Sequence, residues 1–286
     1  MKFFFILFKF LFTFPNKIYL TKNINYGNKE FLIIKNDAIN LISKLISDEV
    51  ENVLKEVKIN KLEKISLKTK EYHFMITRYF SNKVLNEIEK ILKDKKFLNN
   101  ISEHFGYKIK LSQFAIRYNF FNADSPVEYG PKMWHRDNDS LFNQLKMFLV
   151  LNDLTDESGG HFYFIPQRII PSYKKIYSYY KDNENFNKND KNSRVKNIDI
   201  EKKYNLKDNI IKYGSDKSEA LILDTNETYH KGGYIKNKGS YRILLQVIYE
   251  PAYLSISNYS KLYNNFIYRF LKIFLLGLKN RLRKTI

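Results

Sequence analysis

The sequence predicts an α+β fold: a double-stranded β-helix (a cupin-like jelly roll) buttressed by N-terminal helices. Two observations predict it. Apolar residues recur at helical spacing in the early part of the chain, whereas later segments are short runs rich in β-branched and aromatic residues. Helices followed by a series of strands are typical of a fold in which helices cover an antiparallel β core.

Length and composition agree with a globular protein. At 286 residues the chain suits one large domain, and 22 Tyr and 23 Phe contribute to a hydrophobic content of 44%. The absence of cysteine excludes disulfides, thiolate metal sites and cysteine nucleophiles. The net charge of +19 suggests an anionic partner, although a bias towards Lys, Asn and Ile weakens that argument. No recognised nucleic-acid module is present, so we expect no nucleic-acid partner.

We expect one domain overall, in three parts. Residues 1–110 form an N-terminal segment and supporting helices, residues 111–251 the β-helix core, and residues 252–286 a basic, apolar C-terminal helix. The N-terminal apolar run is interrupted by Lys9 and is too short to span a bilayer. The C-terminal helix either packs on the core or lies on an anionic membrane surface. We therefore expect a cytoplasmic protein, with peripheral contact to the inner face of the membrane through this helix as an open alternative.

The individual elements follow from local signals. Residues 36–58 are predicted to form a helix capped by Asp37, and residues 81–104 a second helix capped by Ser81 and ended by Gly106. Composition predicts five strands, at Leu111–Phe121, Leu145–Leu151, Gly160–Ile165, Ala220–Leu223 and Arg242–Tyr249. The polar stretch 180–218 is expected to be a surface excursion within the core, with a lid as one role.

Three residues, His135, Asp137 and His230, are the best candidates for a metal site. His135 and Asp137 are separated by one residue, so on an extended segment both side chains point to the same face. His230 must reach them from a distant segment, as a sheet allows. Two imidazoles and one carboxylate are the ligands of the facial triad of non-heme Fe(II) oxygenases, which leaves metal positions open. Asp139 and His161 remain alternative ligands.

Two arginines extend the candidate site. Arg242 begins an apolar strand-like run, and its planar guanidinium can hold a carboxylate through two hydrogen bonds. A 2-oxo acid that chelates iron through its oxo and C1 carboxylate groups needs such a partner for its far carboxylate. Arg117, on the strand before the His-x-Asp segment, is a further candidate contact for an anionic cosubstrate or substrate. Taken singly, each residue also has an ordinary structural explanation, such as an ion pair or a turn.

From about Leu111 to Pro251 the chain resembles the phytanoyl-CoA dioxygenase-like family of Fe(II)/2-oxoglutarate-dependent oxygenases. The landmarks are Trp134-His-Arg-Asp137, the strand Leu145–Asp153, the run Thr155–Pro166, His230 and Arg242. The resemblance implies that His135, Asp137 and His230 bind Fe(II), that Arg242 binds 2-oxoglutarate, and that dioxygen is the other cosubstrate. The chain departs from the family after Pro166, where Gln167 and Arg168 replace a frequent Gly-Ser-His, which puts a role for a histidine there in doubt.

The expected function is hydroxylation of a C–H bond of a small organic substrate, with release of succinate and CO2. Anionic and lipid-like compounds are among the candidate substrates. Two alternatives stay open. One is a cupin-like metalloenzyme with non-oxygenase chemistry, which would give Arg242 no role. The other is a non-catalytic protein that binds a membrane surface through its basic, apolar ends.

Overall fold

The computed structural model of the protein describes residues 30–57, 73–123, 130–137, 144–166, 169, 194–226 and 228–252. The expectations for the N-terminal apolar run, the C-terminal helix and Asp139 fall outside these residues. Within them, no helix combines the length and the apolar character that crossing a membrane would require.

Among the described residues, three α-helices precede most of the strands: α2 (Asp37–Glu56), α4 (Asn82–Leu92) and α5 (Lys95–Phe105). The α2 helix lies where the sequence predicted a helix, but its cap is Asn36 and not Asp37. The Asn36 side chain accepts a hydrogen bond from the backbone N–H of Ile39 at 3.0 Å. Asp37 is instead the first helical residue, where its negative charge favours the N-terminal end of the helix dipole.

The helix predicted at residues 81–104 is two helices. Ser81 caps α4 as predicted, and Gly106 ends α5 in a left-handed conformation with φ of 76°. Between them the Asp94 side chain accepts a hydrogen bond from the N–H of Phe97 at 2.9 Å and so begins a new helix. The apolar spacing continues across this break, which is why periodicity alone did not reveal it.

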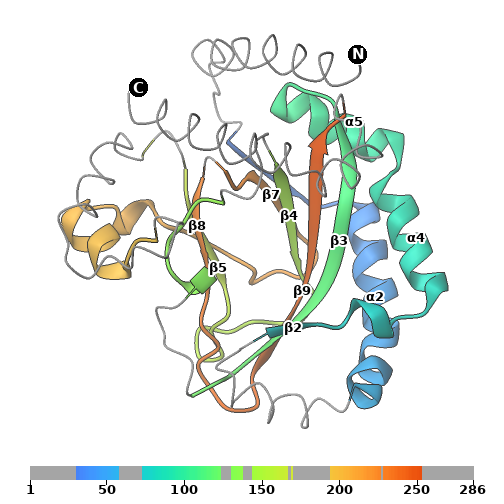
Figure 1. The fold of residues 1–286 in the computed structure, drawn as a ribbon, viewed down its shortest axis with the longest axis horizontal. Coiled ribbons are helices and arrows are strands. Elements are labelled where there is room, and N and C mark those ends of the chain that lie inside the picture. Colours follow the sequence, from blue (N-terminus) through green and yellow to red (C-terminus); the bar gives the residue numbers. More distant parts are fainter. Residues whose placement is uncertain are drawn as a thin grey trace, which may run out of the picture.

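The described residues contain nine strands in two antiparallel sheets (Figure 1). The larger sheet has the order β1–β7–β4–β9–β3–β2; its strands are β1 (Phe31–Ile34), β2 (His73–Met75), β3 (Ile109–Phe120), β4 (Leu145–Val150), β7 (Ala220–Asp224) and β9 (Tyr241–Pro251). The smaller sheet has the order β6–β5–β8; its strands are β5 (Phe162–Ile165), β6 (Ile211–Tyr213) and β8 (Tyr229–Gly232). The five predicted strands are confirmed as β3, β4, β5, β7 and β9. The other four are only three or four residues long.

The two faces of the larger sheet pack on different partners. In β9, Ile243, Leu245 and Val247 belong to the core shared with the helices, whereas Leu244 packs in the core shared with the smaller sheet. The same alternation runs through β3, β4 and β7, as expected where side chains point alternately to opposite faces. The result is three layers: helices, larger sheet, smaller sheet. Figure 1 shows the helices on one side of β3, β4 and β9, with β5 and β8 on the other.

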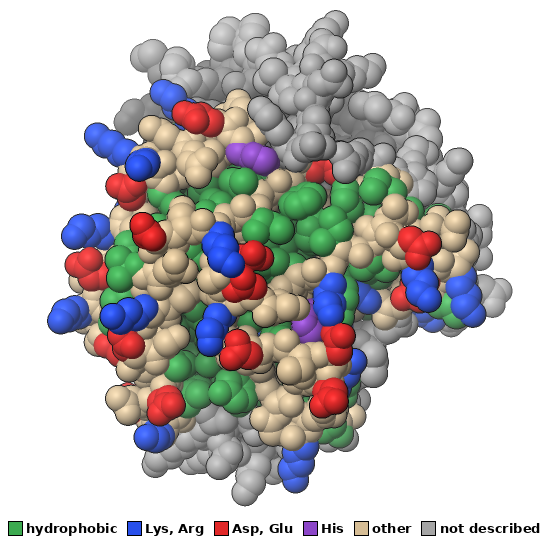
Figure 2. Space-filling model, turned by 180° about the vertical axis from the view of Figure 1, so that it is seen from behind, with side chains coloured by type: hydrophobic (Ala, Val, Ile, Leu, Met, Phe, Trp, Pro, Cys, Tyr) green, Lys and Arg blue, Asp and Glu red, His purple; other side chains and the backbone are tan. Residues whose placement is uncertain are grey.

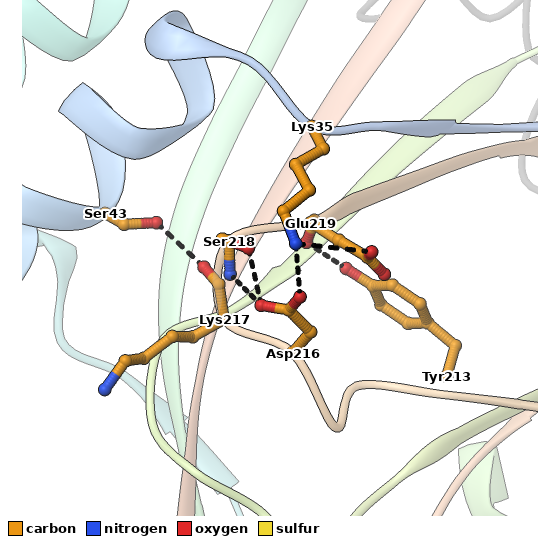
Figure 3. Close-up of polar contacts among 7 residues, drawn as sticks. All are labelled: Lys35, Ser43, Tyr213, Asp216, Lys217, Ser218 and Glu219. Carbon is orange, nitrogen blue, oxygen red and sulfur yellow. Dashed lines mark hydrogen bonds and ion pairs between the residues drawn. The ribbon is translucent and has the colours of Figure 1, made fainter.

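Near the start of α2, a group of polar contacts joins Lys35 and Ser43 to residues 213–219 (Figure 3). Lys35 Nζ lies 2.8 Å from a carboxylate oxygen of Asp216 and 3.9 Å from one of Glu219. The Tyr213 hydroxyl, on β6, lies within hydrogen-bonding distance of the carbonyl oxygens of Glu219 and Phe148. The exposed ion pairs contribute little stability, whereas the buried tyrosine connects the smaller sheet to β4.

The polar stretch 180–218 is described from residue 194 onwards, and this part is not only a surface excursion. Strand β6 pairs with β5, and Val195 and Ile200 are fully buried in a cluster with Trp134. Backbone hydrogen bonds of 3.1 and 2.7 Å also join Trp134 to Val195. The expectation was wrong for these residues because isolated apolar side chains among lysines and asparagines give no periodic signal.

On the face opposite to that of Figure 1, acidic and basic side chains are interspersed (Figure 2). Apolar side chains are visible between them, across the middle of the view. The net charge of +19 of the whole chain therefore does not form a continuous basic surface on this face.

Replacing the cap between α4 and α5 tests the helix break. Asp94→Ala is expected to lower the free energy of unfolding by about 1 kcal/mol, because the N–H of Phe97 loses its acceptor. Urea unfolding followed by circular dichroism measures this change. Lys96→Ala, an exposed site in the same helix, is the control and should change stability by less than about 0.5 kcal/mol. Equal stabilities of Asp94→Ala and the control would contradict the capping role.

Candidate metal centre

His135, Asp137 and His230 meet between the two sheets. One ligand atom from each lies within 4.8 Å of the others, and within the described residues this is the one group of its kind. Backbone pairing brings the two histidines together: the N–H of His135 donates to the carbonyl of His230 at 3.0 Å, and the reverse bond is 2.9 Å. The segment around His135 thus lies beside β8. The N–H of Asp137 donates to the carbonyl of Thr225 at 2.8 Å, which fixes the third residue.

Both imidazoles are oriented by their Nδ1 atoms. His135 Nδ1 lies 2.7 Å from the carbonyl oxygen of Met133, and His230 Nδ1 lies 3.0 Å from that of Thr228. A carbonyl accepts only from N–H, so Nδ1 carries the proton and Nε2 keeps a free lone pair. Burial lowers the pKa of His135 to about 3, and burial also lowers the pKa of His230. Both rings are therefore neutral near pH 7, the state in which histidine binds metals.

Asp137 supplies the negative charge. Its carboxylate oxygens lie 3.7 Å from Nε2 of His135 and 3.7 Å from Nε2 of His230. Burial alone would raise the pKa of this carboxyl, but its electrostatic interactions with His230 and with the ammonium group of Lys146 outweigh that effect, and the pKa falls below its ordinary value. Lys146, from β4, donates to Asp137 Oδ2 at 2.6 Å. The carboxylate is thus ionised and held in one orientation.

This donor set suits a divalent transition metal. Two neutral imidazole nitrogens and one carboxylate oxygen face a common centre, and each histidine has its second nitrogen bonded to a backbone carbonyl, as is usual for metal-bound histidine. Nitrogen and oxygen donors of this kind fit Fe(II) as well as Zn(II), Co(II) or Ni(II), so the residues fit the expected metal without selecting it. Three protein ligands leave coordination positions for other molecules.

Arg242 and Arg117 line the same cavity as the three ligand residues. Arg242 is buried on β9, and its Nη1 donates to the carbonyl oxygen of Gly160. Arg117 lies on β3, directly opposite Leu244 of β9. His73 of β2 is close to both: burial first, and then the charges of Arg117 and Arg242, lower its pKa to about 4. A group of two permanent cations and one neutral imidazole therefore occupies the side of the cavity formed by β2, β3 and β9.

The cavity has a volume of about 260 Å³. The larger sheet contributes its inner face and the smaller sheet the opposite wall. Phe162 of β5 lines it, with its ring stacked on His230 at 5.5 Å between centroids. The described lining residues are His73, Arg117, Asn119, Pro131, His135, Asp137, Lys146, Phe148, Phe162, Arg194, His230, Gly232, Gly233, Arg242, Leu244 and Gln246. Asp137 is the one acidic residue among them.

The sequence did not single out Lys146, Arg194 or Gly232, which also line this cavity. A lone lysine within the apolar run of β4 was a usable signal for Lys146, because a buried charge needs a partner. No local sequence pattern indicated Arg194 or Gly232. His161, considered as an alternative ligand, is buried but does not belong to the His-Asp-His group. Asp139 lies outside the described residues.

No protein-family model matches this chain, and no curated protein matches it. Solved structures that resemble it include HygX from Streptomyces hygroscopicus with iron bound (13% identity, 79% of this chain and 84% of that chain covered, TM-score 0.47). A second is the non-heme alpha-ketoglutarate-dependent carbocyclase SnoK from nogalamycin biosynthesis (11% identity, 78% of this chain and 80% of that chain covered, TM-score 0.46). A third is a prolyl 4-hydroxylase from Phytophthora capsici (9% identity, 85% of this chain and 69% of that chain covered, TM-score 0.42). Similarity at this level assigns neither a family nor an activity, so the site residues must support both.

Substitution of the ligand residues tests the metal centre. His230→Gln is expected to weaken Co(II) or Mn(II) binding by more than roughly 100-fold, because one of three donors is lost. Isothermal titration calorimetry on metal-stripped protein measures the affinity. His161→Gln, another buried histidine, is the matched control and should bind the metal as the unmodified protein does. Loss of binding in the control but not in His230→Gln would show that the wrong histidine was chosen.

Proposed function

We propose that this protein is an Fe(II)- and 2-oxoglutarate-dependent dioxygenase that hydroxylates a C–H bond of a small organic substrate. One atom of dioxygen enters the substrate as a hydroxyl group and the other enters 2-oxoglutarate, which leaves as succinate and CO2. The observation that carries the proposal is the placement of Arg242 in the same cavity as His135, Asp137 and His230. The three ligand residues explain the binding of a metal and nothing more. The buried guanidinium of Arg242 in the same cavity can in addition bind the carboxylate of an anionic cosubstrate.

The roles of the chain's own residues follow from their contacts. His135, Asp137 and His230 hold the metal, which with 2-oxoglutarate and dioxygen supplies the oxidising chemistry. Lys146 keeps the Asp137 carboxylate in one orientation through its 2.6 Å hydrogen bond. Arg242 binds the far carboxylate of 2-oxoglutarate, and its bond to the carbonyl of Gly160 fixes the direction of the guanidinium.

Apolar side chains limit the access of water to this site. Phe148, Phe162 and Leu244 line the cavity beside the metal ligands, and the rings of Phe148 and Phe162 are in contact, with centroids 4.4 Å apart. A dry environment strengthens the interactions of the buried charges and protects a reactive centre from side reactions.

The arrangement of the strands supports the jelly-roll assignment. Along the chain, β4 lies in the larger sheet, β5 and β6 in the smaller, β7 in the larger, β8 in the smaller and β9 in the larger. A chain that passes repeatedly between two facing antiparallel sheets is the pattern of a double-stranded β-helix. We also propose membership of the phytanoyl-CoA dioxygenase-like family, on the sequence landmarks from Leu111 to Pro251.

The charges in the cavity favour an anionic substrate. Arg117, Arg194, Arg242 and Lys146 line it, against the single carboxylate of Asp137 among the described residues. A divalent metal and the two negative charges of 2-oxoglutarate balance each other, so the lining remains positive when both are bound. Arg194 lines the same cavity, and after burial its charge also helps to lower the pKa of both His135 and His230. We therefore assign Arg194 to the substrate.

Turnover of 2-oxoglutarate tests the proposed activity. Protein loaded with Fe(II) without oxygen and then exposed to air is expected to form succinate from 2-oxoglutarate. Arg242→Gln should raise the KM for 2-oxoglutarate by roughly 10-fold to 100-fold, since a hydrogen-bonded charge pair is lost. Arg78→Gln, an arginine in contact with Tyr79 outside the cavity, is the control. Metal binding without succinate formation would favour another kind of metalloenzyme, and failure to bind metal would favour a non-catalytic protein.

The charge of the substrate can be tested before its identity is known. Small metabolites are supplied in matched pairs, such as a phosphate ester with its free alcohol, and 2-oxoglutarate consumption is measured. The anionic member of a pair is expected to give the stronger stimulation, and Arg194→Gln should remove most of the difference. Lys217→Gln, at an exposed turn, is the control. Equal stimulation by charged and neutral members, or an unchanged Arg194→Gln variant, would contradict the assignment.

A further inference from the structure

Gly232 occupies a position in the cavity where a strand would ordinarily carry a side chain. It is the last residue of β8 and lies directly opposite Phe162 of β5. His230 is two residues earlier on the same strand, so both residues face the same side. Both line the cavity, together with Phe162. Gly232 thus lies on the path between the metal ligands and Arg242.

Neither backbone conformation nor crowding demands a glycine here. Gly232 is not among the glycines with positive φ, so other residues can adopt its conformation. A Cβ atom placed on it would lie 3.7 Å from Nη2 of Arg242 and 3.7 Å from the carbonyl oxygen of Pro131, both ordinary contact distances. The next residue differs, because a Cβ on Gly233 would lie 2.2 Å from the carbonyl oxygen of His161. That clash is with the backbone, so no side-chain movement can relieve it.

A glycine in a strand weakens the fold. It loses more conformational freedom on folding than any other residue and adds no packing to the sheet. A strand glycine often marks a bulge, a tight bend, or a place where a ligand or another backbone approaches closely, and the position of Gly232 in the cavity lining favours the ligand. Gly232 belongs to the cavity lining, and its Cβ position lies within contact distance of the guanidinium of Arg242. A ligand that passes over Gly232 therefore reaches from the metal ligands to that guanidinium.

We propose that Gly232 is the specificity-determining residue for the cosubstrate, because the carbon chain of the bound 2-oxo acid passes over it. The inference rests on the proposed function, in which one end of the acid chelates the metal and the far carboxylate binds Arg242. A side chain at position 232 would occupy the space of the two methylene groups between these ends. It would exclude a five-carbon dicarboxylic acid while leaving room for a 2-oxo acid that ends near the metal.

The affinities of two 2-oxo acids for Gly232 variants test this inference. Gly232→Ala and Gly232→Val are loaded with Co(II), and binding of 2-oxoglutarate and of pyruvate is measured by calorimetry in the absence of oxygen. Pyruvate has the chelating end but neither the methylene chain nor the far carboxylate. We expect valine to weaken 2-oxoglutarate binding by roughly 10-fold or more and alanine to weaken it by a few-fold. Pyruvate and Co(II) should bind all three proteins alike.

A matched control distinguishes the effect of position 232 from the general effect of placing a valine in this sheet. Lys212→Val places the same side chain in the same sheet, on an exposed residue of β6 opposite Tyr163, which faces away from the cavity. It should leave both affinities unchanged. Thermal unfolding of each variant shows whether it is folded, and Gly232→Ala, with ordinary contact distances, supplies the result if Gly232→Val does not fold.

The outcomes distinguish this inference from the function on which it rests. Failure of the unmodified Co(II) protein to bind 2-oxoglutarate would overturn the proposed function. Normal binding by the unmodified protein, with 2-oxoglutarate bound equally well by the Gly232 variants, would overturn only the role of Gly232. Equal losses for pyruvate and 2-oxoglutarate would also overturn it, because the effect would then not depend on the length of the acid.

Discussion

The backbone pairing of His135 with His230 is the contact on which the candidate site depends. Two hydrogen bonds, of 3.0 and 2.9 Å, hold together segments that are far apart in the sequence. Because the peptide groups are paired, the two side chains start from neighbouring points of one small sheet, and their rings come to lie 4.4 Å apart between centroids. The bonds from Nδ1 to the carbonyls of Met133 and Thr228 then turn both Nε2 atoms towards Asp137. Local backbone geometry thus sets a donor arrangement that two flexible side chains would not hold by themselves.

The buried charges around this pairing lower the stability of the metal-free protein. Asp137 and Lys146 are both largely removed from water, and their 2.6 Å contact offsets only part of the desolvation penalty. Arg242 is also buried, with a backbone carbonyl as a hydrogen-bond partner. Apolar residues of similar size would stabilise such a core better. A metal ion and an anionic cosubstrate would each add a partner for these charges, so ligand binding is expected to stabilise the fold through mass action.

The sequence predicted the parts of the structure that have a local signal. Their β-branched and aromatic content revealed the long strands β3, β4 and β9, and the spacing of His135 and Asp137 placed both side chains on one face. The short strands β6 and β8 gave no such signal, because three or four residues are too few for a run of that composition to stand out. The cap at Asp94 was hidden by apolar spacing that continues through it. Arg194 and Gly232 could not be found, since their importance comes from distant segments that the fold places around one cavity.

The position of the site also depends on the register of β9. Arg242, Leu244 and Gln246 face the cavity, while the residues between them face the helices, so a slip by one residue would turn Arg242 into the apolar core and Ile243 towards the metal. Pairing with β3 on one side and β4 on the other prevents that slip along most of the strand. The packing of the helices against the sheet therefore does more than stabilise the protein. By making one register far more favourable than the next, it fixes which side chain of β9 can reach a ligand bound between the two sheets.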